Sequence, residues 1–110
     1  RARKERLLDM LREARSLLEA LRGRGRKVAL DRAGEVFSSE AFAARLEAWA
    51  TPGAAFVVGG HLGLHESVLR ASDRTWSLSP MTFPHELARV LAAEQIYRAL
   101  TILRGVPYHR

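Results

Sequence analysis

The stretch TWSLSPMTFPHELARV, residues 75–90, decides the fold of this chain. It predicts a short strand over residues 75–78, a compact turn around Pro80 and a helix that begins at Pro84. Pro84 suits the first turn of a helix, because the N–H that proline lacks is not needed there. The stretch holds no glycine for a phosphate, no cysteine for a metal and no paired acids for hydrolysis. The role of this strand–turn–helix joint therefore has to be inferred from the rest of the chain.

The segments before this joint alternate between helical and extended patterns. Apolar residues at steps of three and four predict a helix over residues 2–22. KVALD, residues 27–31, predicts a strand and is followed by a loop over residues 32–37. Ser38 is a good helix N-cap, with Glu40 in the first turn, so a helix is expected from Ser38 to about residue 50.

Two further elements precede and one follows the joint. AAFVVGG, residues 54–60, is apolar without alternation, which predicts a central strand covered on both faces. Residues 65–71 predict a short helix. The last helix is expected to end near residue 103, with Gly105 after it. Its expected inward positions are Leu87, Val90, Leu91, Ile96, Ala99, Leu100 and Leu103.

The order of these elements is helix, strand, helix, strand, helix, strand, helix. Such alternation predicts an α/β fold with a layered, mostly parallel sheet flanked by helices. At 110 residues, the whole chain fits a single domain.

Composition and charge bound the classes of function. Residues 1–27 hold ten Lys/Arg and four Asp/Glu and carry the whole net charge of +6, since the rest of the chain is balanced. A basic arm beside a neutral globule is typical of nucleic-acid binding, and an arginine-rich solvated helix face is the alternative. With no cysteine, no apolar run of membrane-spanning length and no visible signal peptide, we expect a cytoplasmic protein without membrane contact or thiolate-bound metal.

The motifs of common enzymes are weak or missing. GGHLGL, residues 59–64, follows a buried strand, but its glycine spacing supports neither a dinucleotide nor a triphosphate, and a tight turn is the alternative. The four histidines, His61, His65, His85 and His109, form no H-E-x-x-H, so no metal site is expected. Ser38 is interpreted as a cap and Ser79 as a turn residue, since no G-x-S-x-G elbow surrounds either.

One reaction needs none of the missing groups, and this is methyl transfer from a sulfonium donor. The donor brings its own leaving group, so the protein has only to align the reacting atoms and hold the adenosine. Residues 77–83, SLSPMTF, then have a role as a shaped and mostly apolar cradle.

Several stretches together resemble one known family. LDRAGEVFSSEAFA, FVVGGHLGL, WSLSPMTFPHELARVLAAEQIYRA and PYHR are similar, in order and spacing, to the ribosomal RNA large subunit methyltransferase H family of the SPOUT superfamily. The match covers about residues 28–110. The block from Leu78 to Ala99 and the terminal PYHR are its most specific parts.

The resemblance implies a fold, an activity and a cofactor site. Members are homodimers with a deep trefoil knot in the C-terminal part of an α/β sheet. They use S-adenosylmethionine to methylate N3 of a pseudouridine in 23S rRNA of the assembled ribosome. By position, the cofactor contacts are expected at Leu30, Gly59, Leu78, Ser79, Pro80, Met81, Thr82 and Phe83.

The resemblance also marks Arg98, Tyr108 and His109 as candidate catalytic residues. The tail, Tyr108 to Arg110, is expected to reach the cofactor pocket of the partner subunit. Arg98 is expected to contact a phosphate or the base, and its alternative role is an ion pair with Glu94. His109 is the best candidate for a general base, since free imidazole titrates near pH ~6.5. Stabilisation of the substrate anion by Arg98 or Arg110 is the alternative.

Two departures from the family accompany the match. The chain begins at Arg1 within a charged, helix-like segment, and the family's N-terminal strand with a VGK-like segment is not found, so we expect that an N-terminal part of the natural protein is absent from this chain. Glu35 stands where the family commonly has a lysine. Two other functions stay open: a non-catalytic RNA-binding or ribosome-associated module with this fold, and a purely structural α/β dimer.

Overall fold

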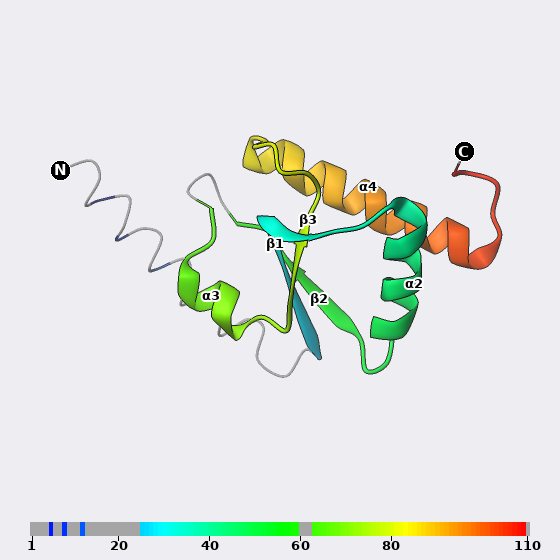
Figure 1. Cartoon of the computed structure of the whole chain (residues 1–110), viewed down its shortest axis with the longest axis horizontal. Coiled ribbons are helices and arrows are strands. Elements are labelled where there is room, and N and C mark those ends of the chain that lie inside the picture. The colour runs from blue at the N-terminus through cyan, green and yellow to red at the C-terminus, as the bar shows by residue number, and fades with distance from the viewer. Residues whose placement is uncertain (1–4, 6–7, 9–11, 13–24, 60–62, 110) are drawn as a thin grey trace.

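The computed structural model describes residues 5, 8, 12, 25–59 and 63–109. From residue 25 onward the elements alternate as predicted (Figure 1). They are β1 (Arg26–Val36), α2 (Ser39–Trp49), β2 (Ala54–Val57), α3 (Glu66–Ala71), β3 (Arg74–Ser77) and α4 (His85–Arg104). The helix expected over residues 2–22 lies outside the described residues, apart from positions 5, 8 and 12.

The described sheet has three strands in the order β2-β1-β3, and both pairs are parallel. The α/β prediction with a mostly parallel sheet is confirmed. The prediction that residues 54–60 form a central strand is wrong, because β1 pairs with both neighbours and β2 lies at an edge of the described sheet. The other part of that prediction, a strand covered on both faces, is confirmed, since apolar clusters cover both faces of β2.

Strand β1 is longer than predicted: it includes residues 32–36, which were expected to form a loop. Leu30 and Glu35 both pair with Trp76 of β3, so residues 31–34 form an irregularity between two stretches of ladder. The Ser77 hydroxyl donates to the carbonyl of Arg32 at 2.9 Å. At Gly34, a Cβ atom would lie 2.7 Å from the Thr75 carbonyl carbon. The two strands approach so closely there that only glycine fits.

The ends of the longer helices follow the local signals in the sequence. The Ser38 hydroxyl accepts from the Ala41 amide at 3.0 Å and caps α2 as predicted. Helix α4 has Pro84 as its N-cap residue and ends at Gly105, whose φ of 70° lies in the left-handed region. Helix α3 is capped by His65, whose Nδ1 accepts from the Ser67 amide at 3.0 Å.

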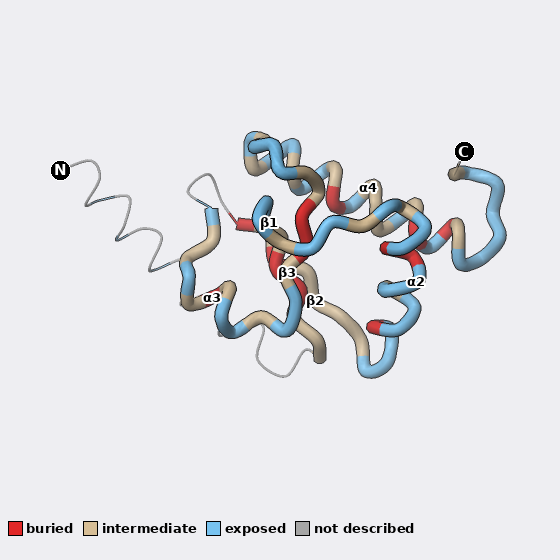
Figure 2. Tube along the Cα trace, viewed as in Figure 1, coloured by how far each residue is buried: buried red, intermediate tan, exposed pale blue. Residues whose placement is uncertain are grey.

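Two apolar clusters hold the layers together. Figure 2 shows the buried residues, in red, on the strands and on the helices around them. The main cluster joins the sheet to α2 and α4, and in it Phe42 stacks on Trp76 with 4.2 Å between ring centroids. Phe56 of β2 packs against this cluster, whereas Val57 packs with Val68 of α3 in the second one. Alternate side chains of β2 are thus buried by different helices.

The inward face of α4 differs from the prediction. Ala99 is buried, and Leu91 and Ile96 are half-buried. Leu87, Val90, Leu100 and Leu103 are exposed, so their predicted burial is wrong in this chain. Small residues, Ala92 and Ala99, bring the helix close to the core and fix which face turns inward. The exposed apolar residues Leu87, Val90, Tyr97 and Leu100 are called the α4 stripe below.

Among the residues that the structure describes, no helix combines the length and apolarity needed to cross a membrane.

Candidate functional site

A cavity of about 820 Å³ lies at the carboxyl ends of the strands. Leu30 of β1, Gly59 after β2 and Leu78 after β3 contribute to its wall. Ligands of parallel α/β sheets bind at this edge. The volume falls within the roughly 300–1,000 Å³ of small-molecule sites.

The joint between β3 and α4 forms one side of the cavity. The Met81 amide donates to the Ser79 hydroxyl at 3.0 Å, so Ser79 is the turn residue that its position predicted. Seven of the eight residues predicted to contact the cofactor line the cavity, and Pro80 does not. The seven are Leu30, Gly59, Leu78, Ser79, Met81, Thr82 and Phe83. Their contact with a cofactor stays a prediction.

Gly59 is buried where two segments of backbone nearly touch. A Cβ atom added to it would lie 2.7 Å from the Gly63 carbonyl carbon and 2.9 Å from the Leu64 nitrogen. Gly63 itself has a φ of +79°. The close approach explains Gly59, and the left-handed backbone conformation explains Gly63, whereas His61 of the GGHLGL motif lies outside the described residues.

The sequence analysis did not assign three titratable residues of the cavity to the site: Asp31, Arg32 and His85. Asp31 accepts from the Ala33 amide at 3.2 Å and turns the irregular part of β1. The Arg32 guanidinium donates to the Thr82 hydroxyl at 3.2 Å, and this contact joins β1 to the loop before α4. Their positions directly after Leu30 were the only available signal for Asp31 and Arg32.

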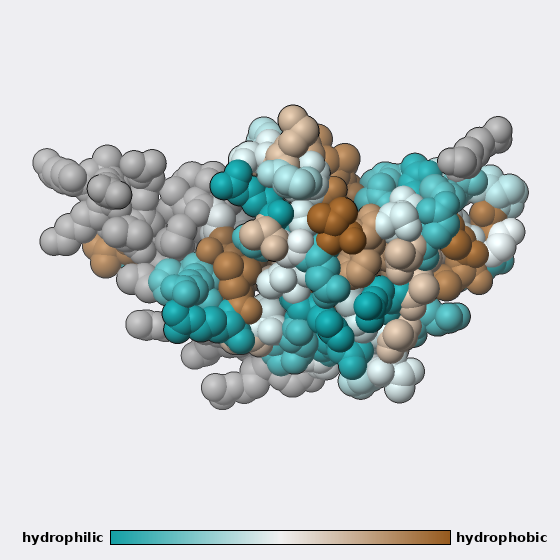
Figure 3. All heavy atoms as spheres, in the orientation of Figure 1, coloured by the Kyte–Doolittle hydropathy of each residue, from teal (hydrophilic) through white to brown (hydrophobic). Residues whose placement is uncertain are grey.

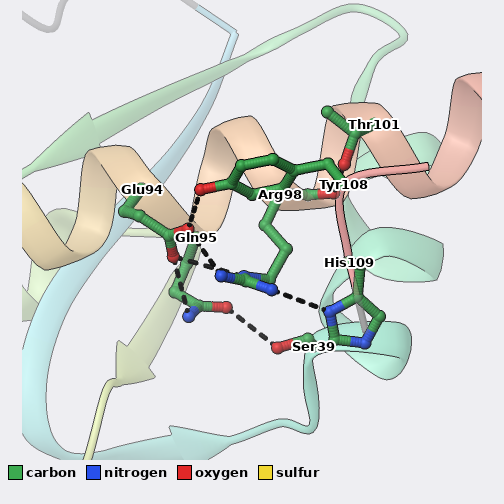
Figure 4. A network of polar contacts seen from close by, with 7 residues as sticks. All are labelled: Ser39, Glu94, Gln95, Arg98, Thr101, Tyr108 and His109. Carbon is green, nitrogen blue, oxygen red and sulfur yellow. Dashed lines mark hydrogen bonds and ion pairs between the residues drawn. The ribbon is translucent and has the colours of Figure 1, made fainter. Parts of the chain in front are cut away.

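A second polar site surrounds Arg98 on α4 (Figure 4). Arg98 donates to Glu94 twice, from Nε to Oε1 at 3.3 Å and from Nη2 to Oε2 at 2.8 Å. The Tyr108 hydroxyl donates to Glu94 Oε2 at 2.8 Å, and the Arg98 guanidinium lies 4.9 Å from the centre of the Tyr108 ring. The ion pair expected between Glu94 and Arg98 is thus confirmed, and the tail joins it.

His109 connects this network to α2. Arg98 Nη1 lies 3.0 Å from His109 Nδ1, and His109 Nε2 lies 3.0 Å from Glu40 Oε2. The three predicted catalytic residues, Arg98, Tyr108 and His109, therefore lie together. Arg110 lies outside the described residues.

The network shifts the protonation equilibria of its members. Hydrogen bonds from Arg98 and then from Tyr108 lower the pKa of Glu94, and its carboxylate raises the pKa of both donors. The hydrogen bond with His109 lowers the pKa of Glu40. At neutral pH both carboxylates are ionised and Tyr108 keeps its proton.

The network and the cavity are separate within one chain. Ala88 of α4 lines the cavity, and Arg98 lies ten residues further along the helix. At a rise of about 1.5 Å per residue, this separation corresponds to about 15 Å. Among the described residues, no group of three or more His, Cys, Asp or Glu side chains could hold a metal ion.

The parallel sheet, the flanking helices and the cavity at the strand ends define an α/β protein with a small-molecule site. A family model described as "Predicted SPOUT methyltransferase" matches residues 1–109, and the chain belongs to this family.

Curated relatives agree with the family model. Three proteins named "Ribosomal RNA large subunit methyltransferase H" match this chain. The protein from Alkalilimnicola ehrlichii is 50% identical over 100 residues, which are 89% of this chain and 64% of the relative. The protein from Sorangium cellulosum is 51% identical over 84 residues, 74% of this chain and 58% of the relative. The protein from an Anaeromyxobacter species is 48% identical over 100 residues, 89% of this chain and 65% of the relative.

The resemblance noted from the sequence is confirmed by these matches. The chain spans somewhat less than two thirds of the length of these relatives.

Proposed function

We propose that this chain is a methyltransferase that uses S-adenosylmethionine to methylate N3 of a pseudouridine in 23S rRNA of the assembled ribosome. The observation that carries the proposal is the cavity at the strand ends, lined by seven of the residues that the family resemblance assigns to the cofactor. The names of the relatives support the large-subunit rRNA as substrate. We also propose a cytoplasmic homodimer with the trefoil knot of the family, supported by membership of that family.

The cavity residues fit an adenosine-bearing methyl donor. When bound, S-adenosylmethionine supplies the methyl group and its own leaving group. Leu30, Leu78 and Phe83 offer apolar contacts for a purine, and Gly59, whose backbone lies against Gly63 and Leu64, forms part of the same wall. Asp31 and Thr82 offer polar groups suited to sugar hydroxyls.

The proposed dimer would bring the two sites together. The α4 stripe places its exposed apolar side chains along one helix. On the face drawn in Figure 3, by comparison, hydrophobic residues lie in separate groups among hydrophilic ones. If two α4 helices pack antiparallel about Glu94, Arg98 of one chain lies across from residue 90 of the other. That position is two residues from Ala88, which lines the cavity. We therefore propose that Arg98, Tyr108 and His109 act at the cavity of the partner.

The proposed chemistry needs an N3–H of a uracil-type ring to be lost. A general base works best with a pKa near the working pH, which makes His109 one candidate. Guanidinium N–H groups that stabilise the developing anion, from Arg98 or Arg110, are the alternative. Either role keeps the reacting ring next to the tail.

The decisive experiment is a methylation assay with S-adenosylmethionine on intact ribosomes, free large subunits and free rRNA, followed by mapping of the modified nucleotide. We expect transfer to N3 of a pseudouridine in the ribosome. Methylation of a different position would contradict the proposed specificity.

Calorimetry with S-adenosylmethionine separates the enzyme from its alternatives. A non-catalytic RNA-binding module or a structural dimer would show no saturable binding. A substitution of Met81, which lines the cavity and is 72% exposed, tests whether the cavity is the cofactor site. Met81→Asp should abolish cofactor binding and leave RNA affinity unchanged. Unchanged binding of the cofactor by this variant would mean that the site lies elsewhere.

A mixed dimer tests whether the tail acts on the partner. One chain is truncated after Val106 and the other carries Met81→Asp. Recovery of activity on mixing is expected, because one of the two sites would then have an intact cavity and an intact tail. A truncated homodimer with full activity would refute the role of the tail.

A further inference from the structure

The carboxylate of Glu94 accepts hydrogen bonds from three side chains. Oε1 accepts from Arg98 Nε at 3.3 Å and from Gln95 Nε2 at 3.2 Å. Oε2 accepts from Arg98 Nη2 and from the Tyr108 hydroxyl, both at 2.8 Å. An ionised carboxylate has about four lone-pair sites, so these four bonds use its whole capacity. Glu94 has no acceptor left for a substrate proton.

Gln95 is itself fixed. Its Oε1 accepts from the Ser39 hydroxyl of α2 at 3.0 Å, so Glu94 is linked through Gln95 to a second helix. The side chains of Glu94 and Arg98 are only 31% and 25% exposed. The two parallel hydrogen bonds between these side chains fix the orientation of the guanidinium, and partial burial reduces the screening of the pair by solvent.

The hydrogen bond between Arg98 and His109 can have only one direction. A guanidinium has donors and no acceptor, so His109 Nδ1 must accept from Arg98 Nη1. His109 Nε2 then carries the proton and donates to Glu40. In this arrangement His109 is neutral, and its lone pair is directed to Arg98 and not to a substrate.

These contacts use three of the five N–H donors of Arg98: one to His109 and two to Glu94. Two N–H groups remain without a partner among the described residues. Two N–H groups on one guanidinium suit the oxygens of a phosphate or of an ionised uracil-type ring.

We propose that Glu94 is a positioning residue for the methyl transfer: it fixes Arg98 and Tyr108 so that the two remaining guanidinium N–H groups meet an anionic group of the RNA. This inference rests on the proposed function. Glu94 acts through Arg98 and Tyr108 and does not itself touch the substrate. In this arrangement His109 orients Arg98 and is not a base.

The kinetic test is Glu94→Gln, assayed for methyl transfer to ribosomes. The amide would turn its own donor toward Arg98 and misplace the guanidinium. We expect kcat to fall on the order of 10–100-fold, the size of effect that small misplacements produce. KM for ribosomes should stay equal or fall, because a negative charge near the RNA site has been removed. If Glu94 merely set the local charge, kcat would stay unchanged.

The matched control is Glu66→Gln on α3. Glu66 pairs with Arg70 at 2.7 Å with the same four-residue spacing but contacts no tail residue in the described structure. Its kcat should equal that of the wild type. A Tyr108→Phe change in the Glu94→Gln background should cost little more, because Tyr108 would already have lost its acceptor. Full additivity of the two changes, or a wild-type kcat for Glu94→Gln, would overturn the proposal.

A spectroscopic experiment tests the hydrogen-bond network without measuring enzyme activity. In ¹⁵N-histidine NMR of the full chain at neutral pH, His109 should show a protonated Nε2 and an unprotonated Nδ1, and Glu94→Gln should mix the two tautomers. The opposite tautomer in the wild type would overturn the geometry. If the wild type methylates no RNA but shows the expected tautomer, the proposed function is refuted, whereas the hydrogen-bond geometry of the network is supported.

Discussion

Gly59→Ala is the sharpest test of the cavity. The added methyl carbon would lie 2.7, 2.9 and 3.0 Å from the Gly63 carbonyl carbon, the Leu64 nitrogen and the Gly63 oxygen. Favourable contacts between heavy atoms lie at about 3.5–4.0 Å. All three neighbours are backbone atoms, so the wall of the cavity has to move by about 0.5–1 Å to restore these distances.

Overpacking of this kind costs about 1–3 kcal/mol. If the displaced wall is the one that binds the cofactor, part of this cost appears as lost affinity. Since about 1.4 kcal/mol corresponds to tenfold in Kd, the upper limit is roughly a 150-fold weakening. We expect titration calorimetry with S-adenosylmethionine to show a 5- to 150-fold increase in Kd, within the range set by about 1–3 kcal/mol.

Gly105→Ala is the control. It adds the same methyl group at the end of α4, where nothing lies within 4 Å but φ is +70°. The left-handed conformation should cost about 1–2 kcal/mol of stability, without an effect on the cavity. Thermal unfolding would show that both variants fold. A folded Gly59→Ala protein with the wild-type Kd would refute either the close backbone approach or the site.

Three further predictions concern the core, a cap and the tail. Phe42→Ala removes the ring that stacks on Trp76 and should lower the free energy of unfolding by about 3–5 kcal/mol in a urea titration. Ser38→Ala removes the N-cap of α2 and should cost about 1 kcal/mol in the same assay, whereas no loss would contradict the capping contact. The pKa of Tyr108 is raised by Glu94, so docking of the tail should persist below the ordinary tyrosine pKa of 10.0 and be lost as the pH rises through the higher folded value. Phenolate absorbance should show this delayed ionisation in the wild type, and Glu94→Gln should remove the delay; identical titrations would contradict the hydrogen bond.

Element ends were predictable because their causes are local. The Ser38 hydroxyl caps a helix three residues away, and Pro84 and Gly105 limit α4 through their own backbone preferences. These signals act within one turn of the chain and need no knowledge of the fold.

The continuation of β1 and the inward face of α4 depend on tertiary neighbours. Residues 32–36 show no strand pattern, and they are extended because Glu35 and Val36 find partners on β3. Apolar residues occur on more than one face of α4, so periodicity alone does not say which face meets the core. Ala92 and Ala99 decide it by allowing close packing.

The site was predictable only in part for the same reason. The cavity residues were proposed from likeness to a family, not from spacing. Tyr108 meets Glu94 across 14 positions, and His109 meets Glu40 across 69. No pattern within the sequence joins Glu40 to the tail, and Glu40 was predicted only as a residue of the first turn of a helix.

The irregularity in β1 has a consequence for how this protein can evolve. Residues 31–34 begin and end beside the same residue of β3, Trp76, so the ladder resumes where it stopped. Side-chain changes at the start of this insert would leave the pairing on either side in register, whereas Gly34 is held by its close approach to Thr75. Asp31 and Arg32 lie in the insert and line the cavity. The rim of the pocket can therefore diverge between relatives while the sheet beneath it stays the same.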